Sequence, residues 1–370
     1  MRSRKGVWVA KPMGAKRIGA VVAAAGRSSR MGEFKPLLPF RAFLGGTVIG
    51  TIVSTLRSAG AESVVVVTGR EAERLKAALE PGVEYVHNAS YASTPMFVSV
   101  CLGLAEARNR TERIFFTPAD TPLFTRETLL RLLESDARVA VPTHFGAPGH
   151  PVLMDSHVVP DILGYPEGTL REALAACAAE YVEVPDPGVL IDVDTPSDYA
   201  LSRLLAGELP EGGAIPERIR RHMKATADFA AGLGTLLNVR GNCGLNLPEL
   251  ELGALLHDVR RAEPHHAEAG ARTLADAGQP RLAEIVRQHM LPDEAERTKI
   301  SEVTVLYVAD KMMEGERVVP LEDRFARRAE GLSGASLQAM EQRFGIAAAL
   351  KSRMETLISE KITPGLLGFD

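Results

Sequence analysis

The sequence is poor in cysteine, in long apolar runs and in net charge, and each shortage excludes a class of protein. Its three cysteines, Cys101, Cys177 and Cys243, are scattered, so they indicate no disulfide framework and suit a reducing cytoplasm. No apolar run approaches the roughly 20 residues that a membrane span needs. A net charge of -4 provides no strongly basic face for a general nucleic-acid binder. We therefore expect a cytoplasmic protein whose partners are neither membranes nor nucleic acids.

The length and the distribution of glycine and proline predict two domains. A chain of 370 residues that is 45% hydrophobic has material for more than one core. Residues 1–17 are basic but lack the apolar core of a secretory signal, so we interpret them as a flexible leader. Glycine and proline concentrate in 207–216, the composition of a linker. We place the domains at 18–206 and 217–362.

Hydrophobic periodicity changes between the two domains. In the first, strand-like and helix-like segments alternate, which predicts a three-layer, doubly wound α/β fold with ligands at the carboxyl ends of the strands. The expected strands are 18–25, 63–68, 83–87 and 113–116, and the expected helices are 47–59, 71–79, 95–107 and 199–205. The second domain has helical periodicity throughout, which predicts an all-α fold. Its expected helices are 218–231, 249–259, 266–277, 280–290, 299–313 and 337–359.

A loop of small and cationic residues follows the first expected strand. Gly26 and Gly32 permit positive φ or close approach of a ligand, and Arg27, Arg30 and Lys35 add positive charge. Backbone N–H groups in such a turn can point at phosphate oxygens. The loop matches neither G-x-G-x-x-G nor G-x-x-x-x-G-K-[ST], and an isolated loop of this composition is usually a solvated turn. We expect a nucleoside triphosphate here.

Acidic residues follow the strand at 113–116 and precede the helix at 199–205. Asp120 lies where ligands meet such a sheet, and Asp192 and Asp194 close the first domain. A carboxylate beside a triphosphate requires an intervening cation, for which Mg²⁺ is the obvious choice. Two alternatives stay open from the residues alone: Asp120 could form an Asx turn, and Asp194 could cap the helix that begins near Pro196.

The run Ala-Ala-Gly-x-Ser-x-Arg-Met-Gly, followed by Lys35 and Leu-Leu-Pro, resembles the opening motif of the MobA/MocA-like nucleotidyltransferases. The resemblance implies transfer of NMP from an NTP to a phosphorylated acceptor with release of pyrophosphate. It implies that Arg30 and Lys35 stabilise the transferred charge, and that Asp120 and Asp194, with Asp192 next, hold Mg²⁺. It implies a nucleotide site formed by Ala24, Ala25, Gly26, Arg27, Arg30, Met31, Gly32, Lys35 and Ser99.

Two further segments bear on the substrates. The second alanine before the glycine, Ala25, is similar to the cytidylyltransferase branch of this family, which favours CTP and a molybdopterin acceptor. Gly149 and His150 resemble the acceptor segment Gly-x-x-Gly-His-Pro, although His150 could instead stabilise a turn. Residues 95–99 retain only Met96 and Ser99 of the stretch that cytidylyltransferases have there, so a sugar or polyol phosphate acceptor remains the alternative.

The second domain contains a spaced set of histidines and aspartates. Asp310 lies within an otherwise apolar helix, where a charge is costly unless it is paired or coordinated. Any single histidine could be an ordinary core or surface residue. In order, the set resembles the HD superfamily of metal-dependent phosphohydrolases. Its members are His222, His257, Asp258, His266, His289 and Asp310.

The HD resemblance implies a binuclear site bridged by Asp258, which we also count as catalytic. Of the adjacent histidines His265 and His266, His265 is the less suitable ligand, because His266 has the family spacing to Gly270. Mixed imidazole and carboxylate ligation suits Fe, Mn, Co, Ni or Zn. Such a site would hydrolyse a phosphoester or phosphoanhydride. Alternatively, the HD domain only senses a nucleotide without hydrolysing it. Whether the protein forms a homo-oligomer is left open.

Overall fold

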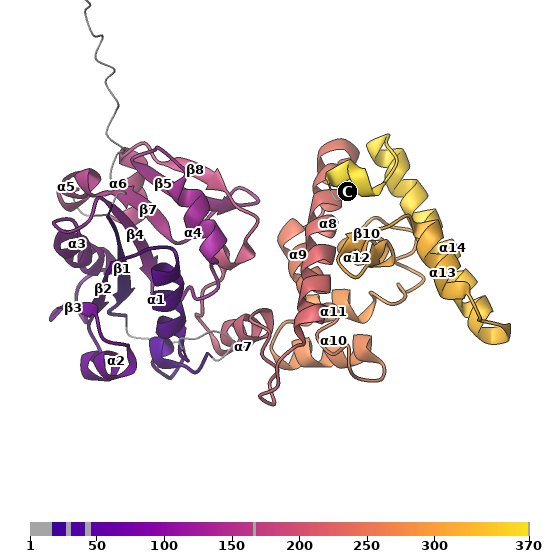
Figure 1. Cartoon of the computed structure of the whole chain (residues 1–370), viewed down its shortest axis with the longest axis horizontal. Coiled ribbons are helices and arrows are strands. Elements are labelled where there is room, and N and C mark those ends of the chain that lie inside the picture. Colours follow the sequence, from indigo (N-terminus) through magenta and orange to yellow (C-terminus); the bar gives the residue numbers. More distant parts are fainter. Residues whose placement is uncertain (1–16, 27–30, 41–45, 166–167, 369–370) are drawn as a thin grey trace, which may run out of the picture.

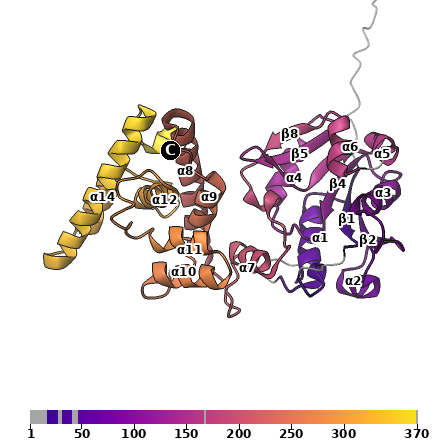
Figure 2. The ribbon, with the colours of Figure 1, turned by 180° about the vertical axis from the view of Figure 1, so that it is seen from behind.

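A computed structural model describes residues 17–26, 31–40, 46–165 and 168–368 of the chain. An α/β part is followed along the chain by a helical part, and helix α7 (Pro196–Leu205) lies between them (Figure 1). The view from behind shows the same arrangement (Figure 2). Most of the expected leader lies outside the described residues. Among the described residues, no helix combines the length and apolar character that crossing a membrane requires.

The sheet of the first part is mixed. Its main path runs in the order β3-β2-β1-β4-β7-β5-β6, and β8 pairs with β5. The first four strands on this path are parallel, but β7 pairs antiparallel with both β4 and β5. The parallel sheet that a doubly wound fold implies is thus interrupted by β7, and β6 also pairs antiparallel, with β5. The strands are β1 (Ile18–Ala24), β2 (Ser63–Thr68), β3 (Val83–His87), β4 (Arg113–Pro118), β5 (Val139–His144), β6 (Ala147–Pro148), β7 (Val152–Asp155) and β8 (Glu180–Glu183).

Helices cover both faces of this sheet and give the expected three layers. Because side chains alternate along a strand, Ala20 and Val22 of β1 face one core, while Val21 and Ala23 face the other. The first core contains side chains of α1 (Val48–Ser58), α2 (Ala72–Ala78) and α4 (Arg126–Leu133). The second contains side chains of α3 (Met96–Ala107), α5 (Val159–Leu163) and α6 (Leu170–Ala176). Burial on both faces explains why β1 is apolar throughout.

The second part is built from seven helices among the described residues and a two-stranded ribbon, β9 (Met313–Glu314) with β10 (Arg317–Val318). Every residue of α12 is buried, so this helix forms the centre of the part. The seven are α8 (Glu217–Gly241), α9 (Leu247–Leu256), α10 (His266–Asp276), α11 (Pro280–Arg287), α12 (Glu302–Lys311), α13 (Leu321–Ala329) and α14 (Gly334–Ile358).

Two contacts between described residues join the two parts. Leu201 and Leu204 of α7 pack in one apolar cluster with Leu256 and Val286 of the helical part. Elsewhere, Nε2 of His144, at the end of β5, lies 2.5 Å from Oε2 of Glu251 in α9, and both side chains are buried. The first contact is apolar and the second is ionic.

The segment 207–216 between α7 and α8 is an ordered turn. Glu208 and Ala214 form an isolated antiparallel bridge, and the Nε of Arg203 donates to Glu208 at 2.9 Å. Ile215 is buried in the apolar cluster shared by α7 and the helical part. The glycines and prolines therefore shape a compact connection.

Candidate active sites

Three segments that are distant in sequence meet at the carboxyl end of β4. Asp120 follows β4, and its backbone oxygen accepts a hydrogen bond from Val193 N at 2.7 Å. That bond holds the segment with Asp192 and Asp194 against the strand end. Lys35, in the short 3₁₀ helix Lys35–Leu37, places Nζ 2.5 Å from Oδ1 of Asp194 and 3.4 Å from Oδ2 of Asp120. The structure thus brings together four of the residues predicted from sequence.

The charges at this point favour a bound cation. Burial and the nearby charge of Asp192 raise the pKa of Asp120 to about 6, while Lys35 opposes the rise. Several acidic groups this close can stay ionised together only when positive charge lies among them. Lys35 supplies one such charge, and the oxygen donors suit Mg²⁺. The residues present therefore fit a magnesium site.

Helix α7 is capped by Thr195 and Asp198, which answers the alternative that Asp194 caps it. The hydroxyl of Thr195 accepts a hydrogen bond from the backbone N–H of Asp198, whose carboxylate accepts one from the N–H of Thr195. Asp194 faces Lys35 instead. Asp192 accepts a hydrogen bond from the hydroxyl of Thr121 at 2.7 Å. Thr121 was not predicted, because a threonine in a strand-exit turn carries no distinctive signal.

A groove lies between the end of β1 and the start of α3. It has a volume of about 490 Å³, and its lining includes Ala25, Gly26, Met96 and Ser99. This volume is within the range of roughly 300–1,000 Å³ typical of small-molecule sites. The side chain of Ala24 points the other way, into the core shared with α1, so the structure does not bring it to the groove.

Of the remaining residues predicted to bind the nucleotide, some are placed by the structure and others lie outside the described residues. Gly32 has a φ of +74°, as a turn residue that favours glycine, and Met31 packs partly buried against the core. Arg27 and Arg30 lie outside the described residues. Asn88 was missed: its Nδ2 donates to Ser99 Oγ at 2.9 Å and to Thr94 Oγ1 at 3.2 Å, which fixes the wall of the groove.

The predicted acceptor segment lies between β6 and β7. A Cβ added to Gly149 would lie 2.2 Å from the backbone oxygen of Val189, so glycine is needed there for packing. The Nδ1 atom of His150 is buried and has no hydrogen-bond partner among the described residues. Burial, together with the charge of Arg171, lowers the pKa of His150 to about 4, so its imidazole is neutral. A neutral ring with an unpaired buried nitrogen can still donate or accept one hydrogen bond.

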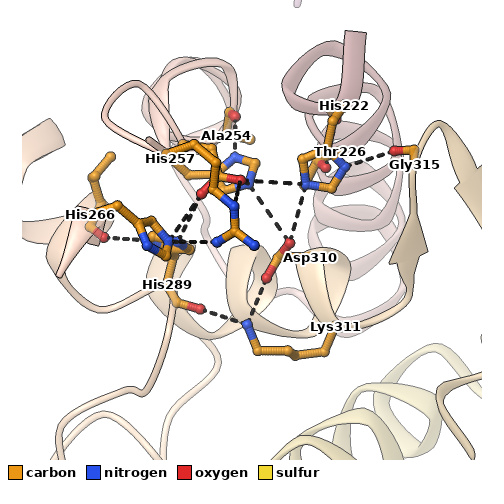
Figure 3. A network of polar contacts seen from close by, with 12 residues as sticks. His222, Thr226, Ala254, His257, His266, His289, Asp310, Lys311 and Gly315 are labelled. Carbon is orange, nitrogen blue, oxygen red and sulfur yellow. Dashed lines mark hydrogen bonds and ion pairs between the residues drawn. The ribbon is translucent and has the colours of Figure 1, made fainter. Parts of the chain in front are cut away.

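The six residues predicted for the HD site converge from five segments of the helical part. Figure 3 shows most of them pointing toward a common centre. His222 comes from α8 and Asp310 from α12, while His266 begins α10. The others immediately follow α9 and α11. These residues form two groups, and within each group the possible ligand atoms lie within 4.8 Å of one another. The first group is His222, His257 and Asp310, and the second is Asp258, His266 and His289.

Asp258 belongs to the second group, and its two oxygens face the histidines of different groups. Its Oδ2 is 3.9 Å from Nε2 of His222 and 3.7 Å from Nε2 of His257. Its Oδ1 is 3.2 Å from Nε2 of His266 and 3.5 Å from Nε2 of His289. This is the placement that a carboxylate bridging two metal ions requires.

Backbone carbonyl groups fix the orientation of three imidazoles. The Nδ1 atoms of His222, His257 and His289 each lie 2.7 Å from a carbonyl oxygen, those of Gly315, Ala254 and Val286 respectively. Since a carbonyl accepts only, each Nδ1 carries the proton and Nε2 is free to bind a metal. The Nε2 of His257 is buried without a hydrogen-bond partner among the described residues. Burial also lowers the pKa of His257 to about 4, which keeps its ring neutral. These donors fit a pair of transition metals.

Cationic side chains surround the HD centre. Lys311 Nζ lies 2.6 Å from Oδ2 of Asp310, as Figure 3 shows, and Arg324 donates to the backbone oxygen of Asp310. Burial opposes the ionisation of Asp310, but Lys311 and His222 hold its pKa well below its usual range. Arg261 contacts Nε2 of His266 at 3.0 Å. His265 is in neither group of possible ligands.

Sequence comparison assigns the same two regions. The family model of the MobA-like NTP transferase domain matches residues 20–206. The chain belongs to this family. The model of the HD domain matches residues 219–332. The chain is therefore a nucleotidyltransferase with an HD domain joined to it.

Two curated relatives and one solved structure are similar to the first region. The molybdenum cofactor cytidylyltransferase of Escherichia coli is 29% identical over 191 residues, which are 50% of this chain and 95% of that protein. A probable molybdenum cofactor guanylyltransferase of Rhodopirellula baltica is 38% identical over 116 residues, 31% of this chain and 54% of that protein. A nucleotidyl transferase from Methanothermobacter thermautotroptrophicus is 28% identical, with a TM-score of 0.45, and the match covers 51% of this chain and 97% of that one.

Proposed function

We propose that residues 18–206 transfer CMP from CTP to a phosphorylated acceptor such as molybdopterin, and that residues 217–362 hydrolyse a phosphoester or phosphoanhydride. The observation that carries the first half is the meeting of Lys35, Asp120 and Asp194 at one end of the sheet. The similarity to a cytidylyltransferase over 95% of that relative's length supports CTP as the donor.

The transfer reaction needs positioning and charge stabilisation. Asp120 and Asp194 would hold Mg²⁺, which when bound offsets the charge of the triphosphate. Lys35 lies between the same carboxylates and can move its ammonium toward a phosphate oxygen. The groove beside Ala25 and Ser99 would orient the nucleoside, and His150 would donate one hydrogen bond to the acceptor. The acceptor phosphate then attacks the α-phosphorus in line, and pyrophosphate leaves.

The hydrolytic half rests on the two ligand groups and on Asp258 between them. The bound metals would lower the pKa of water so that hydroxide forms near neutral pH. Lys311 pairs with Oδ2 of Asp310 and Arg324 donates to its backbone oxygen, while Oδ1 faces His222. Two complete groups favour hydrolysis over mere sensing of a nucleotide, because sensing requires neither a second group nor a bridging carboxylate.

The test is a substrate matrix. We would incubate the full chain with each NTP and Mg²⁺, offer molybdopterin or a polyol phosphate as the acceptor, and follow pyrophosphate and adduct by mass spectrometry. CTP with molybdopterin is the expected pair, and CTP with the polyol phosphate would support the alternative acceptor. Asp120→Ala should abolish turnover because the cation loses a ligand.

A matched control separates loss of the site from loss of the fold. Asp161 on α5 is an exposed acid that forms only a long surface ion pair with Arg138, at 3.6 Å. Asp161→Ala should keep full activity, and both variants should give the circular dichroism spectrum of the parent. Turnover retained by Asp120→Ala would refute the assigned site.

A further inference from the structure

The HD centre opens into a small, strongly cationic cavity. Its volume is about 210 Å³, less than half that of the groove beside Ser99. It is also below the roughly 300–1,000 Å³ of sites that enclose a drug-sized ligand. The positively charged side chains of its lining are Arg218, Arg261, Lys311, Arg324, Arg328 and Arg343.

Three of these six cationic side chains have no partner among the described residues. The side chains of Arg218, Arg328 and Arg343 form no hydrogen bond or ion pair with other described residues. Arg324 is only 4% exposed, and its Nε is buried without a hydrogen-bond partner among the described residues. An unpaired donor in a buried guanidinium is costly unless a ligand satisfies it. Guanidinium groups in such numbers match phosphate oxygens.

The acidic residues of the lining neutralise only part of this charge, through the pairs Lys311–Asp310 at 2.6 Å and Arg261–Asp258 at 3.5 Å. Glu314 is paired with Arg327 at 2.7 Å, and Glu316 with Arg221 at 3.2 Å. Neither of those arginines belongs to the described lining of the cavity. Asp258 and Asp310 are taken up by the metal centre in the function proposed above. The cavity therefore suits a ligand with several negative charges in a small volume.

The lining offers little to hold a nucleobase. Phe325 has the only phenyl ring among the described lining residues, and it is 8% exposed. Its ring packs against Phe344 with centroids 4.9 Å apart, and at 8% exposure it offers a nucleobase little surface to stack on. By contrast, the groove of the transferase region has the volume that a nucleoside needs.

We propose that the HD site hydrolyses inorganic pyrophosphate, the product that nucleotidyl transfer releases. The water oxygen forms a bond to one phosphorus, the bridging P–O bond breaks, and its electron pair leaves with the second phosphate. The two protons of the water end on the two phosphates, so pyrophosphate and water give two hydrogen phosphates. Removing pyrophosphate draws a reversible transfer reaction forward. The inference rests on the proposed function of both sites.

The test measures phosphate release by the full chain loaded with Mn²⁺, with pyrophosphate, CMP, CTP and p-nitrophenyl phosphate as substrates. We expect the highest kcat/KM for pyrophosphate, unchanged in Asp120→Ala and abolished in Asp310→Ala. Arg343→Gln and Arg328→Gln should each raise KM for pyrophosphate about 10- to 100-fold, since a hydrogen bond to a charged group contributes about 1.5–3 kcal/mol. Arg353→Gln, on the same helix as Arg343 but outside the described lining of the cavity, is the matched control and should leave KM unchanged.

The outcomes separate the two proposals. Hydrolysis of CMP or CTP without hydrolysis of pyrophosphate would overturn this inference and leave the phosphohydrolase function standing. A metal-loaded protein that releases phosphate from none of the four substrates would overturn both. Phosphate release that persists in Asp310→Ala but stops in Asp120→Ala would move the activity to the transferase site and overturn the inference.

Discussion

The buried contact between the two parts of the chain should make their association depend on pH. His144 Nε2 lies 2.5 Å from Glu251 Oε2, and His144 Nδ1 lies 2.8 Å from the carbonyl oxygen of Val184. A carbonyl and a carboxylate both accept hydrogen bonds, so both ring nitrogens must carry protons. Burial opposes the charge, but Glu251 and, more weakly, Glu183 raise the pKa of His144 above its ordinary value.

The sign of the pH dependence follows from that raised pKa. A group whose pKa is raised by folding contributes its full stability below the unfolded value of about 6.5 and loses it as pH rises through the folded value. The side chains of His144 and Glu251 are 5% and 4% exposed, so solvent screens the pair little. A hydrogen bond to a charged group contributes about 1.5–3 kcal/mol. Glu251→Gln should therefore cost about this much at pH 6 and much less at pH 9.

The assay is urea unfolding of the full chain followed by circular dichroism, with each transition fitted separately at both pH values. A suitable control is Glu249→Gln, on the same helix. Glu249 pairs with Arg281 at 3.0 Å, and arginine does not titrate in this range, so its cost should be equal at pH 6 and pH 9. A cost of Glu251→Gln that is the same at both pH values would refute the imidazolium assignment.

Two further changes test packing and metal binding. Gly149→Ala should lower the free energy of unfolding by about 1–3 kcal/mol in urea titrations, because the new Cβ would meet the backbone of Val189. Gly345→Ala, in α14 with open space around it, should instead be neutral or stabilising by up to about 1 kcal/mol, and a reversed order would contradict this explanation. His266→Ala should reduce the metal content from two ions to one by mass spectrometry, since His222, His257 and Asp310 remain; two retained ions would exclude His266 as a ligand.

The sequence predicted the elements with strong periodicity and missed those whose signal depends on distant partners. The helix expected at 218–231 extends to Gly241, because Gly234 permits close packing: a Cβ there would lie 2.7 Å from Leu250. Strand β7 was not among the expected strands. Its antiparallel pairing with β4 and β5 is set by tertiary contacts, which local patterns do not encode.

In the candidate sites, too, some features were predicted from the sequence and others are set only by the fold. The two family resemblances were enough to nominate Asp120, Asp194 and the six HD residues. They were not enough to show that Lys35 lies between two of those carboxylates, or that Asn88 fixes Ser99. Arg343 of α14 reaches the HD cavity from a helix that carries no motif, so only the fold places it there.

The HD ligands that follow helix ends owe their orientation to those ends. The last carbonyl groups of an α-helix have no intrahelical partner. His257 directly follows α9 and donates from Nδ1 to the carbonyl of Ala254, three residues earlier; His289, just beyond α11, does the same to Val286. This bond satisfies the carbonyl of Ala254, adds to the one that the carbonyl of Val286 accepts from the N–H of His289, and in both cases turns Nε2 toward the centre. The position of a histidine just beyond a helix end therefore carries structural information, and a change in helix length there would misdirect the ligand even with the histidine retained.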